Sequence, residues 1–229
     1  ELGVAPRSRF AVVPLGLELD RFLQVDRDEE RSGIRKELGL GQRDLIVGIV
    51  GRLVSIKNHE LFLDILPRVI RQSETAARAL VVGAGERESA LREHADRLGI
   101  LGHVTWLGWR RDLPQLYPAM DVLLLTSHDE GTPVAVIEAL VTGTPVVARD
   151  VGGVAEILAG VAGSGPLGTV VPREASMETW AGATHKAASA PPLSRDRRAE
   201  IARFFSVKRL ADDTTALYAE TTKLTRGYR

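Results

Sequence analysis

E-G-T-P-V-A-V-I-E, residues 130–138, connects a short apolar run to a second apolar segment. The run before it, residues 121–126, shows no alternation of polar and apolar residues, so it predicts a strand buried on both faces. The segment after it has the composition of a helix. Glu130 is therefore expected on the loop above the carboxyl end of the strand, and Glu138 on the helix that follows.

Four residues between the two glutamates predict how this helix begins. Thr132 fits the N-cap position, and Pro133 fits the first helical position, where a missing N–H has no cost. The amides of Val134 and Ala135 would then be free at the positive end of the helix dipole. Such a helix end favours a phosphate or a sugar oxygen in the crevice beside it.

Two basic residues follow another expected strand, residues 44–51. Arg52 and Lys57 flank the loop after it, which is where open α/β sheets bind ligands. The alternative, that both are solvated surface residues, remains open on these residues alone. His59, just inside the next helix, has no evident partner and is expected on the surface.

Gly83 and Gly85 follow a third expected strand, residues 78–83. A dinucleotide fingerprint would need a third glycine where Glu88 stands, and a carboxylate there would repel a pyrophosphate. The two glycines instead predict a tight turn that lets the backbone approach a ligand. The sequence contains no P-loop.

Composition limits the classes of function. The 229 residues are 44% hydrophobic, and 30 basic residues balance 30 acidic ones, so no overall field recruits nucleic acid. The absence of cysteine removes disulfides and thiolate metal sites. No apolar run approaches the ~20 residues of a membrane span, and cytoplasm is the default location.

Strand and helix patterns alternate about six times along the chain. This pattern predicts an α/β fold with a doubly wound, Rossmann-like parallel sheet in one domain, residues 1–229. Helices are expected over residues 177–188, 194–205 and 207–225, and a first strand over residues 9–16.

The two glutamates, separated by seven residues, resemble the E-x7-E signature of the family 4 retaining glycosyltransferases. The resemblance implies that Glu130 contacts the donor sugar and that Glu138 holds the ribose hydroxyls. The segment from Val12 to Phe22 is similar to the entry into the C-terminal, nucleotide-sugar-binding domain of this GT-B family. The resemblance therefore implies half of an enzyme, whose last helix reaches toward a missing N-terminal acceptor domain.

The same resemblance implies the other site residues. Arg52 and Lys57 would neutralise the donor diphosphate without a metal, and no other cofactor is implied. Further donor-binding positions implied by the resemblance are Gly83, Gly85, Trp109, Arg110, Gly131, Thr132, Val134, Ala135, Gly152 and Gly153. Trp109 and Arg110 would read the nucleobase largely through backbone groups.

The implied reaction is hexosyl transfer from a nucleoside diphosphate sugar, with UDP favoured, in surface polysaccharide or glycoconjugate synthesis. Pro133 departs from the glycine that many relatives carry, so a sugar contact made there by an amide is lost. The isolated domain is expected to bind donor without efficient turnover, and peripheral membrane association of the full protein stays open. Two alternatives also stay open: a nucleotide-sugar epimerase and a stand-alone nucleotide-sugar-binding module.

Overall fold

A single parallel sheet organises the chain. The computed structural model describes residues 10–161 and 165–226. Six parallel strands pair in the order β3-β2-β1-β4-β5-β6, which confirms the predicted doubly wound sheet. The strands are β1 (Leu45–Val50), β2 (Ala77–Val82), β3 (Val104–Gly108), β4 (Val122–Leu125), β5 (Val146–Arg149) and β6 (Thr169–Val171).

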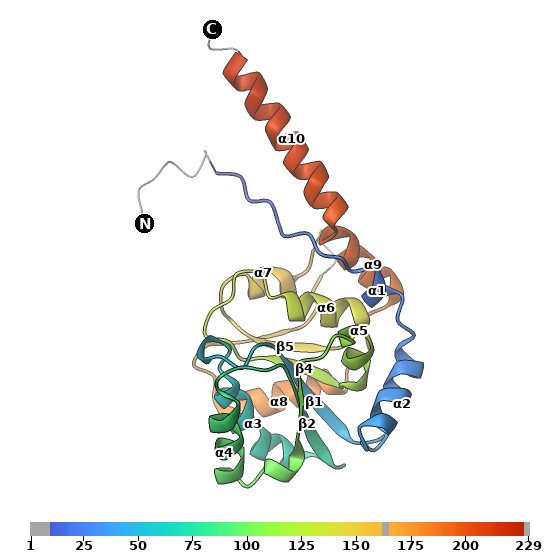
Figure 1. Cartoon of the computed structure of the whole chain (residues 1–229), viewed down its shortest axis with the longest axis vertical. Coiled ribbons are helices and arrows are strands. Elements are labelled where there is room, and N and C mark those ends of the chain that lie inside the picture. The colour runs from blue at the N-terminus through green and yellow to red at the C-terminus, as the bar shows by residue number, and fades with distance from the viewer. Residues whose placement is uncertain (1–9, 162–164, 227–229) are drawn as a thin grey trace.

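Helices cover both faces of this sheet (Figure 1). One face carries α3 (His59–Gln72), α4 (Glu88–Arg97) and α8 (Met177–Ala188). The other carries α1 (Asp20–Leu23), α2 (Arg27–Glu37), α5 (Leu113–Leu116), α6 (Val134–Thr142), α7 (Val154–Ala159) and α9 (Arg195–Phe204). The described residues also contain three short 3-10 turns: η2 (Ser55–Lys57), η3 (Leu101–His103) and η4 (Tyr117–Ala119).

The strands have no polar face because both faces are covered. In β4, Val122 and Leu124 pack into the core beneath α3 and α8, whereas Leu123 and Leu125 pack into the core beneath α6. Successive side chains of a strand point to opposite faces, so a strand between two helical layers must be apolar throughout. This is why the unbroken apolar run predicted the strand correctly.

The start of α6 differs from its prediction. Pro133 occupies the N-cap position, and its carbonyl accepts from the amides of Val136 and Ile137 at 3.0 and 3.3 Å. The helix therefore begins at Val134, and the predicted N-cap at Thr132 is wrong because Thr132 lies one residue too early and caps nothing.

The first predicted strand is also wrong within the described residues. Positions 10–16 join no strand, and Arg9 lies outside the described part of the chain. The segment instead contacts the start of α10 (Val207–Arg226), where the Arg209 guanidinium donates to the carbonyls of Pro14 and Leu15 at 2.6 and 3.0 Å. The predicted last helix is present, and it projects away from the sheet (Figure 1).

Candidate functional site

The strand order reverses between β1 and β4, and their carboxyl ends form the candidate site. In an open parallel sheet, ligands bind in the crevice at such a point. Two contacts hold the loops after these strands together. The Thr126 hydroxyl donates to the carbonyl of Asn58 at 2.9 Å, and the His128 amide donates to the carbonyl of Ile56 at 2.8 Å. The topology thus places the two predicted catalytic loops side by side.

An ion pair crosses between these loops. The Lys57 Nζ lies 2.7 Å from Glu130 Oε1, and the Ser127 hydroxyl donates to the same oxygen at 2.6 Å. The Glu130 side chain is only 8% exposed, whereas that of Lys57 is 27% exposed. An ammonium has three N–H donors. Lys57 can therefore hold Glu130 and still donate to a second anion from the crevice.

The N-terminus of α6 adds backbone donors to the site. Within the described residues, the amides of Val134 and Ala135 have no hydrogen-bond acceptor, and no side chain caps the helix. Helix amides without acceptors, at the positive end of the dipole, form a site that suits an anion. The prediction of free amides at this helix end is confirmed by this geometry, although their binding role remains a prediction.

Four other predicted site residues surround one pocket of about 220 Å³ near the carboxyl ends of β1, β2 and β3. They are Arg52, Gly83, Trp109 and Arg110. Trp109 is 67% exposed, and the guanidinium of Arg111 lies 4.9 Å from its ring centroid.

The side chain of Arg110 borders this pocket and is paired with two carboxylates of the protein. Its Nε donates to Asp112 Oδ1 at 2.8 Å, and its Nη2 also pairs with Glu37 at 3.3 Å. Hydrogen bonding to Asp112 raises the pKa of Arg110 above its usual value. Of these cations, Arg52 has no side-chain partner in the described part of the chain.

The predicted glycines allow loops to pack on one another. Gly83 has φ of 140°, and a Cβ there would lie 1.9 Å from the Gly51 carbonyl oxygen. Gly152 has φ of 50°, and a Cβ there would lie 1.6 Å from the Glu130 carbonyl oxygen. Gly85 is similarly close to Leu53. The close backbone approach at these turns is therefore to neighbouring loops, and Gly152 supports the loop that carries Glu130.

Gly131, Thr132 and Gly153 line another pocket, of about 330 Å³. Phe204 and Phe205 form its apolar side. The pocket lies beside the Glu130 loop, so these three predicted residues are near Glu130 while Arg52 and Trp109 border a different pocket.

Glu138 is held by a residue that the sequence did not single out for function. The Tyr117 hydroxyl donates to Glu138 Oε2 at 2.8 Å. Burial raises the pKa of the Glu138 carboxyl above its ordinary value, against the opposing effects of the Tyr117 hydrogen bond and of Arg21. Val134 and Glu138 are four residues apart, so they share one face of α6. The first residue of α6 and the Glu138 carboxylate therefore lie on the same face of the helix.

Sequence reasoning missed the contacts of two residues and misplaced a third. Ser127 supports Glu130, and its position three residues earlier is the signal that could have revealed it. Tyr117 supports Glu138, but the two residues are 21 positions apart in sequence, so no local signal links them. His59 is not on the surface, since it is only 2% exposed. Neither ring nitrogen has a partner among the described residues, and burial lowers the pKa of His59 to about 4.

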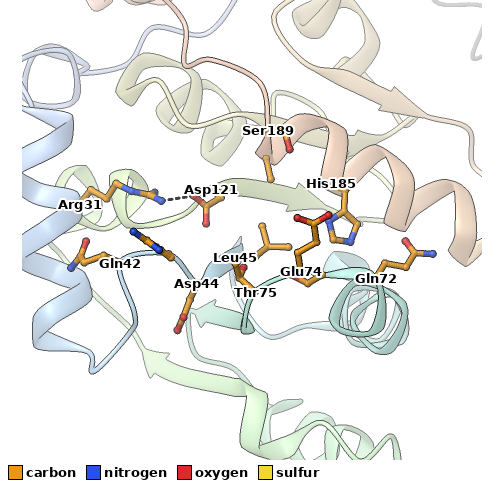
Figure 2. A pocket seen from close by; sticks show the side chains of 13 residues that line it. Arg31, Gln42, Asp44, Leu45, Gln72, Glu74, Thr75, Asp121, His185 and Ser189 are labelled. Carbon is orange, nitrogen blue, oxygen red and sulfur yellow. Dashed lines mark hydrogen bonds and ion pairs between the residues drawn. The ribbon is translucent and has the colours of Figure 1, made fainter.

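A larger pocket, of about 520 Å³, lies at the end of the sheet where the strands begin (Figure 2). It borders the amino ends of β1 and β4, and none of the predicted site residues lines it. Asp121 accepts there from Arg31 at 2.6 Å, from Arg35 at 2.8 Å and from the Ile46 amide at 2.7 Å. These groups satisfy one another, so they join α2 to the sheet.

The described residues contain neither a grouped set of metal ligands nor a helix suited to span a membrane. In positions 10–161 and 165–226, no three His, Asp or Glu side chains are grouped as a metal site would require. Within the same ranges, none of the helices combines the length and the apolar character needed to cross a membrane.

Comparison with known proteins gives consistent matches. The sequence profile described as Glycosyl transferases group 1 matches residues 44–189. The D-inositol 3-phosphate glycosyltransferase of Rhodococcus erythropolis is 34% identical, with 95% of this chain and 50% of the relative covered. The protein of the same description from Gordonia bronchialis is also 34% identical, with 87% of this chain and 43% of the relative covered. The chain thus spans half or less of the length of these relatives.

Solved structures share the fold. Anabaena Alr3699/HepE in complex with UDP-glucose superposes with a TM-score of 0.72 and 25% identity, over 90% of this chain and 56% of that one. A glycosyltransferase from Rickettsia africae gives a TM-score of 0.77 at 18% identity, over 95% of this chain and 59% of that one. The second likeness shows the fold alone.

Proposed function

The chain belongs to the glycosyl transferases of group 1, and from this premise we propose that the crevice between β1 and β4 binds a nucleoside diphosphate sugar. One observation carries the proposal: the pair of Lys57 and Glu130 lies at the strand ends that a donor would approach. The free amides of Val134 and Ala135 follow on the same loop and helix. Cations and amides suit a diphosphate, whereas a carboxylate suits sugar hydroxyls.

The donor diphosphate is assigned to Lys57, Arg52 and the α6 amides. Lys57 retains N–H donors beyond the one that Glu130 receives, and Arg52 has no competing side-chain partner in the described residues. When the bond between the anomeric carbon and the diphosphate breaks, negative charge develops on the departing oxygen. Preorganised donors at that position stabilise the transition state, and this effect is usually the largest single contribution.

The sugar and the ribose are assigned to the two glutamates. Glu130 accepts hydrogen bonds from the hexosyl hydroxyls and orients the sugar, while Glu138 accepts from the ribose. Trp109 and Arg110 border the pocket assigned to the nucleobase. Uridine is the favoured base because Alr3699/HepE, which shares the fold, was solved with UDP-glucose. We assign no protein nucleophile to the retaining transfer.

Two classes of molecule are candidates for the acceptor. The curated relatives carry the name D-inositol 3-phosphate glycosyltransferase, which favours a phosphorylated polyol. The resemblance described in the sequence analysis favours a surface glycan. A panel that contains both kinds of acceptor separates these possibilities in a single assay with labelled UDP-glucose.

Turnover is proposed for the whole enzyme. The curated relatives are about twice the length that this chain matches. Acceptor and donor must be held at near-attack distance in a cleft that excludes water, an effect that can contribute about 7–11 kcal/mol. We therefore propose that this chain by itself binds donor and transfers slowly. Comparison with a longer protein that includes the relatives' remaining half tests this point.

Titration calorimetry of the chain with UDP tests the donor assignment directly. Lys57→Met should weaken binding about tenfold or more, since a charge-assisted contact to phosphate is lost. Lys36→Met is the matched control, because Lys36 is exposed on α2 and remote from the crevice. Equal affinities of wild type and Lys57→Met would remove the diphosphate from this crevice.

A further inference from the structure

Tyr117 is fixed at both ends in the core. Its side chain is fully buried, and its ring packs against Phe22 with the centroids 6.3 Å apart. Its carbonyl accepts from the Thr144 hydroxyl at 2.8 Å and from the Met120 amide at 3.0 Å. The phenol oxygen therefore has a defined position, set by η4 and the surrounding apolar side chains.

This oxygen makes one polar contact, with Glu138. The hydroxyl donates to Oε2 at 2.8 Å, and no other residue in the described part of the chain donates a hydrogen bond to the Glu138 carboxylate. A buried phenol requires a partner, and a carboxylate is a strong one. The contact uses one carboxylate oxygen and leaves Oε1 free. Since the Glu138 side chain is half-buried, Oε1 is the oxygen available to a ligand.

We infer that Tyr117 is a positioning residue, whose hydroxyl orients the Glu138 carboxylate so that Oε1 meets a ribose hydroxyl of the donor. The inference rests on the proposed function, because Glu138 is assigned to the ribose there. Tyr117 does not touch the ligand. It acts by limiting the rotamers of a glutamate that has three side-chain torsions, which lowers the entropy lost on binding.

Two groups that face Glu138 link this contact to pH. They are the Tyr117 hydroxyl on η4 and the Arg21 guanidinium on α1, and both oppose the effect of burial on the pKa of Glu138. Only the ionised carboxylate can accept with every lone pair. Removal of the hydroxyl raises the pKa of Glu138 further. The loss of ribose recognition on acidification then begins at a higher pH than in the wild type.

Titration calorimetry with UDP and 2′,3′-dideoxy-UDP tests the inference on the chain described above. The ratio of the two affinities isolates the ribose hydroxyls from the base and the phosphates. Tyr117→Phe keeps the ring and should reduce this ratio about fivefold, the effect of one hydrogen bond of ordinary strength. It should also move the acidic loss of UDP binding to higher pH. Tyr218→Phe, on the exposed face of α10, makes the same chemical change as a control.

A double-variant comparison separates positioning from packing. In the Glu138→Ala background, Tyr117→Phe should leave the affinity ratio unchanged, because the carboxylate that it orients is gone. Glu138→Gln provides a test that leaves the Tyr117 ring in place, and it should remove the pH dependence of the affinity ratio between the two nucleotides. This second variant keeps the inference testable if Tyr117→Phe fails to fold.

Three outcomes would overturn the inference, and they differ from one another. Equal losses for both nucleotides in Tyr117→Phe would limit the hydroxyl to a structural role, while the donor assignment would stand. Equal binding of both nucleotides by the wild type would show that Glu138 does not read the ribose. A wild type that binds neither nucleotide would remove the proposed function itself, before any variant is considered.

Discussion

Lys57 and Glu130 meet at 2.7 Å across the carboxyl ends of β1 and β4, two strands that are neighbours in the sheet and far apart in sequence. The predicted phosphate-binding cation is thus already paired with the predicted sugar-binding carboxylate. Ser127 donates to the same carboxylate oxygen, so Glu130 keeps one well-defined position without a ligand. A donor diphosphate must share Lys57 with this carboxylate.

Glu130→Gln should separate the two parts of the donor. The substitution removes a negative charge that competes for Lys57 and repels a diphosphate, so the affinity for UDP should rise severalfold. The additional affinity for UDP-glucose over UDP should fall, since the sugar loses a charged acceptor. Calorimetry with both ligands measures the two effects. Asp129→Asn is the control, because it alters a neighbouring exposed carboxylate and can keep its contact with the Glu130 amide. Weaker UDP binding by Glu130→Gln would contradict the shared role of Lys57.

Arg52→Ala should weaken UDP binding about tenfold or more, because a charge-assisted hydrogen bond to phosphate contributes about 1.5–3 kcal/mol. The loss should shrink as salt is added, since the Arg52 side chain is exposed and its field is screened. Arg43→Ala is the matched control for Arg52→Ala. Arg43 is also exposed, but it borders the pocket at the amino-terminal ends of the strands. An equal effect of the two variants would indicate a general influence of net charge and no contact to phosphate.

The sequence predicted the centre of the sheet well because β1 and β4 are covered on both faces and are therefore apolar without interruption. The positions of Arg52, Lys57 and Glu130 followed from the rule that loops after parallel strands meet at one edge. The pairing of Lys57 with Glu130 could not be predicted. It depends on β1 and β4 being adjacent, and strand order is a property of the tertiary structure.

The errors have local physical causes. Thr132 looked like an N-cap, but Pro133 already supplies the carbonyl that starts α6. His59 was expected on the surface because the sequence shows no partner for it, yet it is 2% exposed in the first turn of α3. The segment before α1 is apolar enough for a strand, but the sheet offers it no partner, and Arg209 holds it instead.

Gly152→Ala should destabilise the fold and disturb donor binding together. A Cβ at this position would lie 1.6 Å from the Glu130 carbonyl oxygen, and φ of 50° is unfavourable for alanine. The loop that carries Glu130 must move, and the free energy of unfolding should fall by about 1–3 kcal/mol. Gly182→Ala should have the opposite effect on stability. Gly182 lies in α8, and a Cβ added there would have nothing within 4 Å. It should stabilise the protein by about 0.5–1 kcal/mol. Denaturant titrations of both variants test the contrast, and equal midpoints would refute it.

His59 should make the stability of the protein depend on pH between about 4 and 6.5. Burial lowers its pKa from 6.5 to about 4, and neither ring nitrogen has a partner in the described residues. The unfolded chain therefore binds a proton in this range that the folded protein excludes. Since stability rises with pH wherever the unfolded state binds more protons, the contribution is complete above pH 6.5 and is lost as the pH falls toward 4, by roughly 3 kcal/mol in all.

His59→Leu should remove this slope. The leucine fills the same apolar site without a proton to exclude, so the difference in unfolding free energy between variant and wild type should grow in favour of the variant as the pH falls from 6.5 to 4. His128→Leu is the control, because His128 is exposed and contacts Arg149. Denaturant titrations at several pH values measure the difference curve, in which the other titrating groups cancel. A difference between His59→Leu and wild type that stays constant across this range would show that the imidazole is not held neutral by the fold.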